Sequence, residues 1–191
     1  ITMPFALPSG LLNRFTIGIF NRLVYGSHFQ AVKKGFVDHD KFFYPLDRLH
    51  HWNRAYGKRG VTQHQSVIPT EAGARGIRAM IETLAETGAA SFLTVVKDCG
   101  PEGEGLLSFP RPGMSIALDL PINEGTQQVI DRLNRTVIET GGRIYLTKDG
   151  LSRAEDFSAM EPRLPEFREV RKKWDPSGNL RSAQSRRLLG E

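Results

Sequence analysis

Hydrophobic and polar positions alternate most regularly in the middle of the chain, where four short β-rich runs are separated by two helical patterns and a loop. A period of two residues is typical of a strand with one buried face, and a period near 3.6 is typical of an amphipathic helix. The predicted strands cover residues 61–68, 91–98, 114–120 and 143–147. Residues 100–113 form a loop rich in glycine and proline between the second and third strands.

Each of the two helical patterns has one apolar face. These faces are formed by Ile77, Ile81 and Leu84 on the first helix and by Val129, Leu133 and Val137 on the second. Residues 69–70 supply the entry to the first helix, and Asn123 can cap the second. Gly88 ends the first helix and the glycine pair 141–142 ends the second, so both helices have a defined length.

The resulting order, β-α-β-β-α-β, predicts an α+β fold with a ferredoxin-like core. In this arrangement both helices cover one face of an antiparallel four-stranded sheet. On the third strand, alternation places Met114, Ile116, Leu118 and Leu120 toward the helices and Ser115, Ala117 and Asp119 away from them. Gln63 shares a side with Gln65, and Val95 shares a side with Lys97, but the sequence leaves open which side that is.

The flanking regions divide the chain into three predicted parts. Residues 1–60 are an irregular segment expected to pack on the sheet, with helical stretches at 11–25 and at 45–56, the latter closed at Gly57. Residues 61–150 form the predicted substrate-domain core. Residues 151–191 form a tail of three short helical stretches broken by Pro162, Pro165 and Pro176.

Composition and charge narrow the class of protein. The chain has 191 residues, of which 39% are hydrophobic and 25% charged, which suits one domain with a substantial core. The net charge of +5 suits an acidic partner such as nucleic acid, a membrane surface or a phosphorylated substrate, or else a solvated basic face on the tail. Cys99 is the only cysteine, which predicts a reducing, cytoplasmic compartment, and no apolar run approaches the roughly 20 residues of a membrane span. Numbering that opens at Ile1 indicates a piece of a longer protein.

Several kinds of site lack their motifs. No G-x-S-x-G elbow, no dense histidine spacing and no glycine-rich phosphate loop occurs, so hydrolytic, metal and self-contained nucleotide sites are not expected. RNA-recognition modules share the β-α-β-β-α-β order, but residues 61–68 and 114–120 carry no aromatic side chain to stack a base. A polar patch of Gln63, Gln65, Lys97 and Lys148 remains. Its lysines could equally be strand-edge residues that prevent sheet-to-sheet association.

Six groups of motifs, in the same order along the chain, resemble the C-terminal half of the decaprenylphosphoryl-ribose oxidase group, flavoenzymes of the vanillyl-alcohol-oxidase type. They lie at residues 43–47 with 52–57, 63–71, 91–97, 107–110 with 112–113, 141–145 with 148–149, and 174–176 with 186–188. The resemblance implies that the protein's own N-terminal FAD-binding domain lies outside this chain, whose sheet would cover the isoalloxazine ring of FAD and shape the substrate pocket.

The same resemblance implies an activity and partners. The flavin takes a hydride from a sugar hydroxyl carbon, giving a keto sugar that a separate short-chain reductase can convert to the epimer. The implied substrate is a sugar or a polyprenyl-phosphate-linked sugar, and such a lipid-linked substrate would bring a cytoplasmic protein to the inner face of the membrane. The chain lacks the His-Trp-Gly-Lys run of aldonolactone and alditol oxidases, which stay as one alternative. A free-standing module that binds an anion or RNA is another.

Matching positions give the predicted site. The resemblance assigns substrate binding to Gln63, Gln65, Val95, Ser115, Ala117 and Phe43, places Tyr145 and Lys148 near the flavin, and makes Lys148 and Lys97 the catalytic candidates. A fixed cation such as Lys148 would stabilise the negative charge of the reduced ring, and Lys97 could polarise the hydroxyl or bind a phosphate oxygen. Which lysine has which role is left open. Ser115 and Ala117 replace the Asn and Cys of the characterised mycobacterial enzymes, and Phe43 replaces an aromatic hydroxyl, so this pocket has lost polar and thiol groups.

Overall fold

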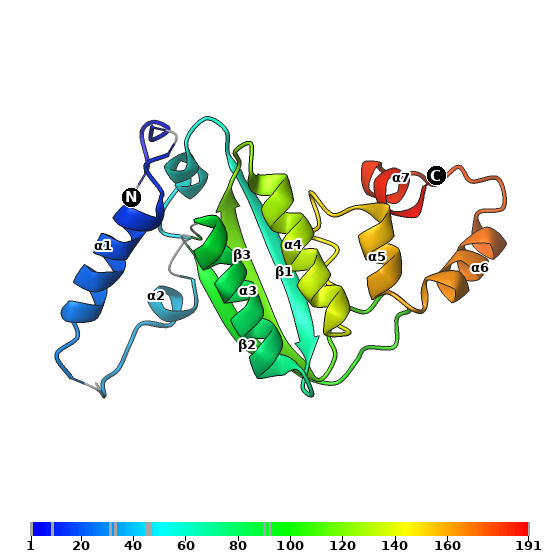
Figure 1. Cartoon of the computed structure of the whole chain (residues 1–191), viewed down its shortest axis with the longest axis horizontal. Coiled ribbons are helices and arrows are strands. Elements are labelled where there is room, and N and C mark those ends of the chain that lie inside the picture. Colours follow the sequence, from blue (N-terminus) through cyan, green and yellow to red (C-terminus); the bar gives the residue numbers. More distant parts are fainter. Residues whose placement is uncertain are drawn as a thin grey trace.

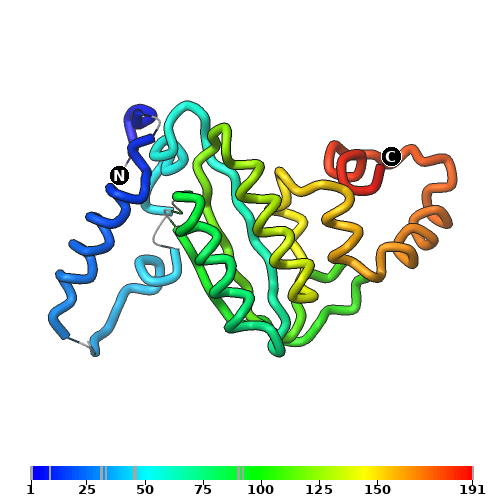
Figure 2. Tube along the Cα trace, viewed as in Figure 1, coloured from blue at the N-terminus to red at the C-terminus, as the bar shows by residue number. Residues whose placement is uncertain are grey.

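The computed structural model describes residues 2–8, 10–30, 32, 34–44, 47–89, 91 and 93–190. The molecule is elongated, with a sheet and two covering helices at its centre (Figure 1). The N-terminal helix α1 lies at one end, and the short helices α5, α6 and α7 lie at the other; the Cα trace in Figure 2 follows the same path.

The predicted α+β class is confirmed. The strands of the described sheet are β1 (Val61–Pro69), β2 (Thr94–Cys99), β3 (Gly113–Pro121) and β4 (Arg143–Ile144), in the spatial order β2-β3-β1-β4 with antiparallel neighbours. Helices α3 (Gly73–Thr87) and α4 (Thr126–Glu139) both lie on one face of this sheet (Figure 1). The order β-α-β-β-α-β is therefore the one that the hydrophobic pattern predicts.

Two strands are shorter than predicted. β2 begins at Thr94 rather than at residue 91, and β4 ends after two residues. The short β4 has a local cause, because the chain turns at once: the Lys148 N–H donates to the Tyr145 carbonyl at 2.8 Å.

The hydrophobic core lies between the sheet and its two helices, as the alternation predicts. Its fully buried members include Ile68, Met80, Ile116, Leu118, Leu133 and Val137. Ile81 was wrongly expected in this core, since 49% of it is exposed, and Met80 occupies the inward position. The cause is Gly76, where a Cβ atom would lie 2.7 Å from Ile68 Cγ2. α3 packs directly against β1 at Gly76, and Met80, four residues further along the same helix face, points inward while Ile81 points outward.

The helix starts also differ from the prediction. Pro69 still belongs to β1, paired with Gly113, so α3 begins only at Gly73. Asn123 does not cap α4 directly, because its Oδ1 accepts the N–H of Gly125, one residue before the helix. Residues 70–72 and 123–125 therefore form turns between strand and helix.

Gly113 is required where β3 begins. Its φ is +157°, and a Cβ atom there would lie 2.1 Å from the Ile68 carbonyl oxygen, so a side chain does not fit between the two paired strands. This glycine lets the loop 100–112 return to the sheet directly beside the end of β1.

The N-terminal segment contains α1 (Arg14–Gly26), α2 (His39–Phe43) and the 3-10 helix η1 (Trp52–Tyr56). α1 starts three residues later than predicted, at an Asn13 capping box. The stretch expected at 45–56 is helical only from Trp52, and it closes at Gly57 as predicted; Pro45 and Leu46, where it was expected to start, lie outside the described residues. α2 was not predicted, because five residues are too few to show a period.

The C-terminal tail has the three predicted helices, α5 (Ala154–Met160), α6 (Leu164–Trp174) and α7 (Ala183–Leu189). Pro165 does not break a helix as expected. It lies in the first turn of α6, where its missing N–H costs no hydrogen bond. Leu188 of α7 packs into the hydrophobic core. The predicted division of the chain into three parts at residues 60 and 150 stays a prediction. No helix within the described ranges is long and apolar enough to cross a membrane.

Candidate functional site

The sheet face opposite α3 and α4, here called the second face, carries most of the predicted site residues. Strand register answers the question that the sequence left open, since residues paired directly across neighbouring strands point to the same side. Ala117 pairs with Gln65 on one side and with Val95 on the other, while Asp119 pairs with Gln63. The second face therefore contains Gln63, Gln65, Val67, Val95, Lys97, Ser115, Ala117 and Asp119.

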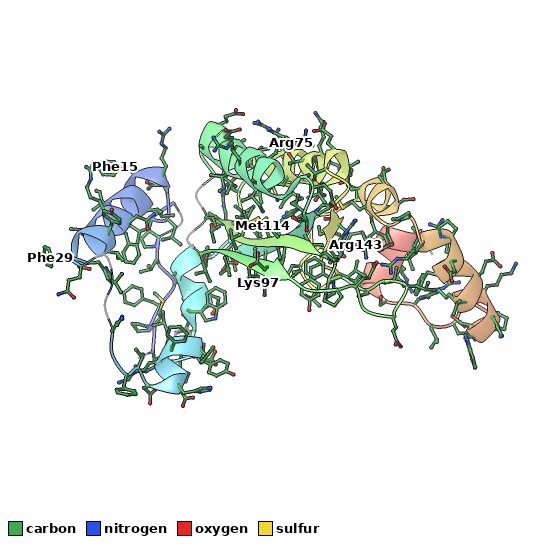
Figure 3. The ribbon with its side chains drawn as sticks, turned by 90° about the horizontal axis from the view of Figure 1, so that it is seen from below. Phe15, Phe29, Arg75, Lys97, Met114 and Arg143 are labelled. Carbon is green, nitrogen blue, oxygen red and sulfur yellow. The ribbon has the colours of Figure 1, made fainter. Side chains whose placement is uncertain are left out.

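Four predicted residues form one row across this face. Val95, Ala117 and Gln65 lie on β2, β3 and β1 in that order, and the Tyr145 N–H donates to the Gln65 carbonyl at 2.8 Å, which extends the row beyond β4. Figure 3 shows the sheet nearly edge-on, with the helix that carries Arg75 on one side and Lys97 on the other. The row thus lies on the side that the chain's own helices leave uncovered.

The glutamine side chains of this face are held in place by their neighbours. Gln65 Nε2 donates to Ser115 Oγ at 3.0 Å, and Gln63 Nε2 donates to Asp119 Oδ1 at 2.7 Å. Tyr56 donates to the other oxygen of Asp119 at 3.4 Å, and burial, together with the Asp119 charge, raises the pKa of this phenol. Each amide uses one of its two N–H groups in these bonds, so the second N–H and the amide oxygen remain for a ligand; Gln63 is half-buried, whereas Gln65 is only 4% exposed.

The two lysines lie at opposite edges of the sheet. Lys97 is exposed on the edge strand β2, opposite Ser115, whereas half-buried Lys148 follows β4 at the other edge. Four strands spaced about 4.8 Å apart separate the backbones of these edges by about 14 Å. The two lysines are therefore not neighbours on the sheet, and their roles at the site stay predictions.

Phe43 is not brought to this row by its described contacts. It ends α2, is 63% exposed, and its ring lies 4.9 Å from His39 and 5.0 Å from Phe42, measured between ring centroids. Its assignment to the substrate site stays a prediction.

The sequence reasoning missed a group of side chains that supports Tyr145. The Phe109 ring, in the loop 100–112, packs on Tyr145 with centroids 4.6 Å apart. This loop is fixed by an ion cluster, here called the arginine clamp, in which Arg143 and Glu161 are buried, Arg163 is partly buried and Glu102 is 40% exposed. Side-chain alternation along residues 143–147 could have identified one residue of the clamp. Arg143 lies two positions before Tyr145, so both side chains point to the same side of the sheet.

The clamp joins the loop to the start of the tail. Arg143 is hydrogen-bonded to Glu102 and donates to the Ser108 carbonyl at 2.7 Å, and Arg163 pairs with Glu102 at 2.9 Å and with Glu161 at 3.0 Å. The hydrogen bond from Arg143 lowers the pKa of Glu102. With two arginines against two glutamates the cluster is neutral, as a buried set of charges must be.

A hollow of about 240 Å³ opens beside the Asp119 end of the second face. Its lining is almost entirely apolar and comes from both the N-terminal segment and the sheet: Met3, Leu7, Leu12, Leu49, Trp52, Ala55, Tyr56, Leu93 and Asp119. In the part of the chain that the structure covers, no three His, Cys, Asp or Glu side chains gather as a metal ion would require. The site is thus a polar platform with an apolar recess at one end.

These features define a ferredoxin-like sheet domain whose polar second face is suited to lie against a ligand. Over 191 residues the chain is 39% identical to the decaprenylphosphoryl-beta-D-ribose oxidase of Mycolicibacterium smegmatis, a match that covers 98% of this chain and 40% of that protein. The predicted resemblance is confirmed: nearly the whole chain is homologous to an oxidoreductase of the decaprenylphosphoryl-ribose oxidase group.

A second relative gives a shorter match. An uncharacterized protein encoded in the mprA 5′ region of Streptomyces coelicolor is 36% identical over 113 residues, which is 59% of this chain and 31% of that protein. Each match therefore covers less than half of the relative. No family model matches it.

Proposed function

We propose that this chain is the C-terminal, substrate-binding part of an FAD-dependent oxidoreductase that oxidises a sugar hydroxyl to a ketone. The observation that carries the proposal is the row of Val95, Ala117, Gln65 and Tyr145 across the face that α3 and α4 leave uncovered, in a chain homologous to an oxidase. Ala117 on β3 is small and half-buried beside exposed Val95, so a planar ring could lie against this part of the row, above the buried pair Gln65 and Ser115. The residues of this row would lie against the isoalloxazine ring of FAD, and the phosphates of FAD would be bound by another part of the protein.

In such a reaction the hydroxyl carbon loses a hydride and the hydroxyl oxygen loses a proton, which leaves a ketone. FAD would supply the hydride acceptor. Lys148 would provide the cation near the reduced ring, next to Tyr145 at the end of the row. Lys97, at the opposite edge, would bind the substrate through its hydroxyl or a phosphate oxygen. Gln63 and Gln65 would accept hydrogen bonds from sugar hydroxyls.

The proposed substrate is a polyprenyl-phosphate-linked pentose. The M. smegmatis relative is named for decaprenylphosphoryl-β-D-ribose, and the apolar hollow beside Asp119 could take part of a prenyl chain next to a sugar on the second face. A short-chain reductase that consumes the keto sugar is the proposed partner reaction. An aldonolactone or alditol oxidase is less well supported, since neither relative carries such a name.

Substitution of the two lysines in the longer, flavin-containing protein tests these roles. We expect Lys148→Met to slow flavin reduction by about 100-fold in stopped-flow absorbance with little change in substrate affinity, because a preorganised charge is lost. Lys97→Met should raise KM about tenfold with a smaller effect on kcat, because it removes a binding contact. Exposed Lys58, substituted by Met, is the control, and it should leave both constants unchanged.

If the two lysines have the opposite roles, Lys97→Met would slow flavin reduction and Lys148→Met would raise KM. If neither lysine affects flavin reduction or KM, the second face is not the substrate site and the proposed function fails. A normal flavin spectrum in every variant is needed for the comparison, since it shows that the flavin is still bound.

A further inference from the structure

The N-terminal segment exposes an unusual number of large apolar side chains. α1 has no buried residue, and the segment that follows it is equally open. Figure 3 shows Phe15 and Phe29 at the outer end of the molecule, away from the sheet. The exposed apolar side chains, here called the N-terminal apolar surface, are Phe15, Ile19, Phe20, Leu23, Val24, Phe29, Val32 and Phe36.

α1 is amphipathic, but none of its residues is buried by the described part of the chain. Phe15, Ile19 and Leu23 recur every four residues along one face, and Arg14 and Arg22 flank this face, lining the same shallow hollow as the three apolar side chains. Phe15 and Leu23 are 72% and 69% exposed. An exposed apolar helix face marks an interaction site, so we expect a surface outside the described residues to cover it.

The charge of residues 1–37 indicates what the N-terminal apolar surface binds. Residues 1–37 contain Arg14, Arg22, Lys33 and Lys34 but no aspartate or glutamate, so all 21 acidic residues of the protein lie at position 38 or later. The C-terminal helix α6 is also basic and exposes Trp174, but its arginines and lysines alternate with glutamates. The N-terminal region, in contrast, combines described exposed apolar side chains with a sequence that has basic residues and no acidic ones.

We propose that the N-terminal apolar surface binds a membrane that contains anionic lipid, with α1 lying in the plane of the headgroups. Apolar side chains would enter the acyl boundary, and each nearby lysine or arginine would gain from the negative surface potential. A protein partner would need both an apolar face and negative charge to complement this surface. An anionic bilayer offers both, since its headgroups are negative and its interior is apolar. This inference does not depend on flavin chemistry, although it would place a lipid-linked substrate next to the second face.

Vesicle sedimentation tests the proposal. The chain is mixed with vesicles of phosphatidylcholine alone or with about 30% phosphatidylglycerol, a fraction that gives a strongly negative surface. We expect binding to the anionic vesicles, weakened several-fold by salt and by the absence of phosphatidylglycerol. The double variant Phe15→Ser/Leu23→Ser should bind these vesicles more than about tenfold more weakly. It lacks two apolar side chains that would be buried in the membrane on binding.

The matched control is Trp174→Ser/Leu180→Ser, which removes two equally exposed apolar side chains from the basic tail and should bind as the unaltered chain does. Both variants should keep the far-UV circular dichroism and the melting temperature, since the four side chains are exposed. The proposal is overturned if the α1 variant binds normally or if only the tail variant loses binding. It is also overturned if sedimentation velocity shows a dimer that depends on Phe15 and Leu23, or if the longer protein does not bind these vesicles.

Discussion

Glu161→Gln is expected to lower the free energy of unfolding by about 3 kcal/mol, the cost of removing one partner from a buried ion cluster. The Glu161 side chain is 4% exposed and pairs with Arg163 at 3.0 Å and with Arg143 at 4.0 Å. After the substitution only Glu102 balances two arginines, and Arg143 already has its Nε buried without a partner in the described structure. Urea unfolding at neutral pH, followed by circular dichroism, measures the loss.

Glu86→Gln makes the same chemical change at the surface. Glu86 pairs with Arg132, but the two side chains are 64% and 44% exposed, so its loss should cost less than about 1 kcal/mol. If both variants lose the same amount, the clamp does not act as a buried ion cluster. A second readout is the Tyr145 ring, whose NMR signals should shift in Glu161→Gln as the loop that carries Phe109 loosens.

Acid is expected to destabilise the fold through His64, by about 3 kcal/mol between about pH 7 and about pH 4. Complete burial, only partly offset by the hydrogen bond to Asn134, lowers the pKa of His64 from 6.5 to about 4. The unfolded chain takes up a proton at this histidine near pH 6.5 and the folded chain does not. Stability from this group is therefore present above pH 6.5 and lost as the pH falls toward 4.

The hydrogen-bond network explains why the folded state resists protonation. Asn134 Nδ2 donates to Asp156 at 2.9 Å, which turns its Oδ1 toward His64, so His64 Nε2 must be the donor of their 3.0 Å bond. A proton on Nδ1 would then be buried with no acceptor among the described residues.

A pair of variants isolates this effect from the titration of carboxylates. His64→Gln removes the titrating group. Between about pH 7 and about pH 4, the variant should therefore lose about 3 kcal/mol less unfolding free energy than the unaltered chain. His28→Gln removes an exposed imidazole and should retain the full pH dependence. Parallel curves for the unaltered chain and His64→Gln would show that His64 is protonated in the folded state.

The sheet could be predicted from sequence because its signals are local. Alternation on β3 separates Ile116 and Leu118 from Ser115 and Ala117, and the structure confirms each side. The sides of β1 and β2 could not be predicted, because parity depends on pairing with β3, which the residues of one strand do not encode.

Other parts depended on long-range contacts. Ile81 was misplaced because the rotation of α3 is set by Gly76 against Ile68, a contact between different elements. The arginine clamp depends on the pair Glu102 and Arg143, which lie 41 positions apart, and no spacing in the sequence indicates such a pair. The roles of Lys97 and Lys148 came from resemblance alone, and the structure adds that they lie at opposite edges of the sheet.

The central claim is that the second face lies against a flavin held mainly by another part of the protein. NMR spectra of the isotopically labelled chain, titrated with FAD, test it most directly. The account predicts a chain that purifies colourless, binds FAD weakly, and shows shifts concentrated at Gln65, Ser115, Ala117 and Tyr145, with His64 on the opposite face unaffected. Shifts confined to the helical face, no shifts at any concentration, or a stoichiometric flavin bound to this chain alone would contradict it.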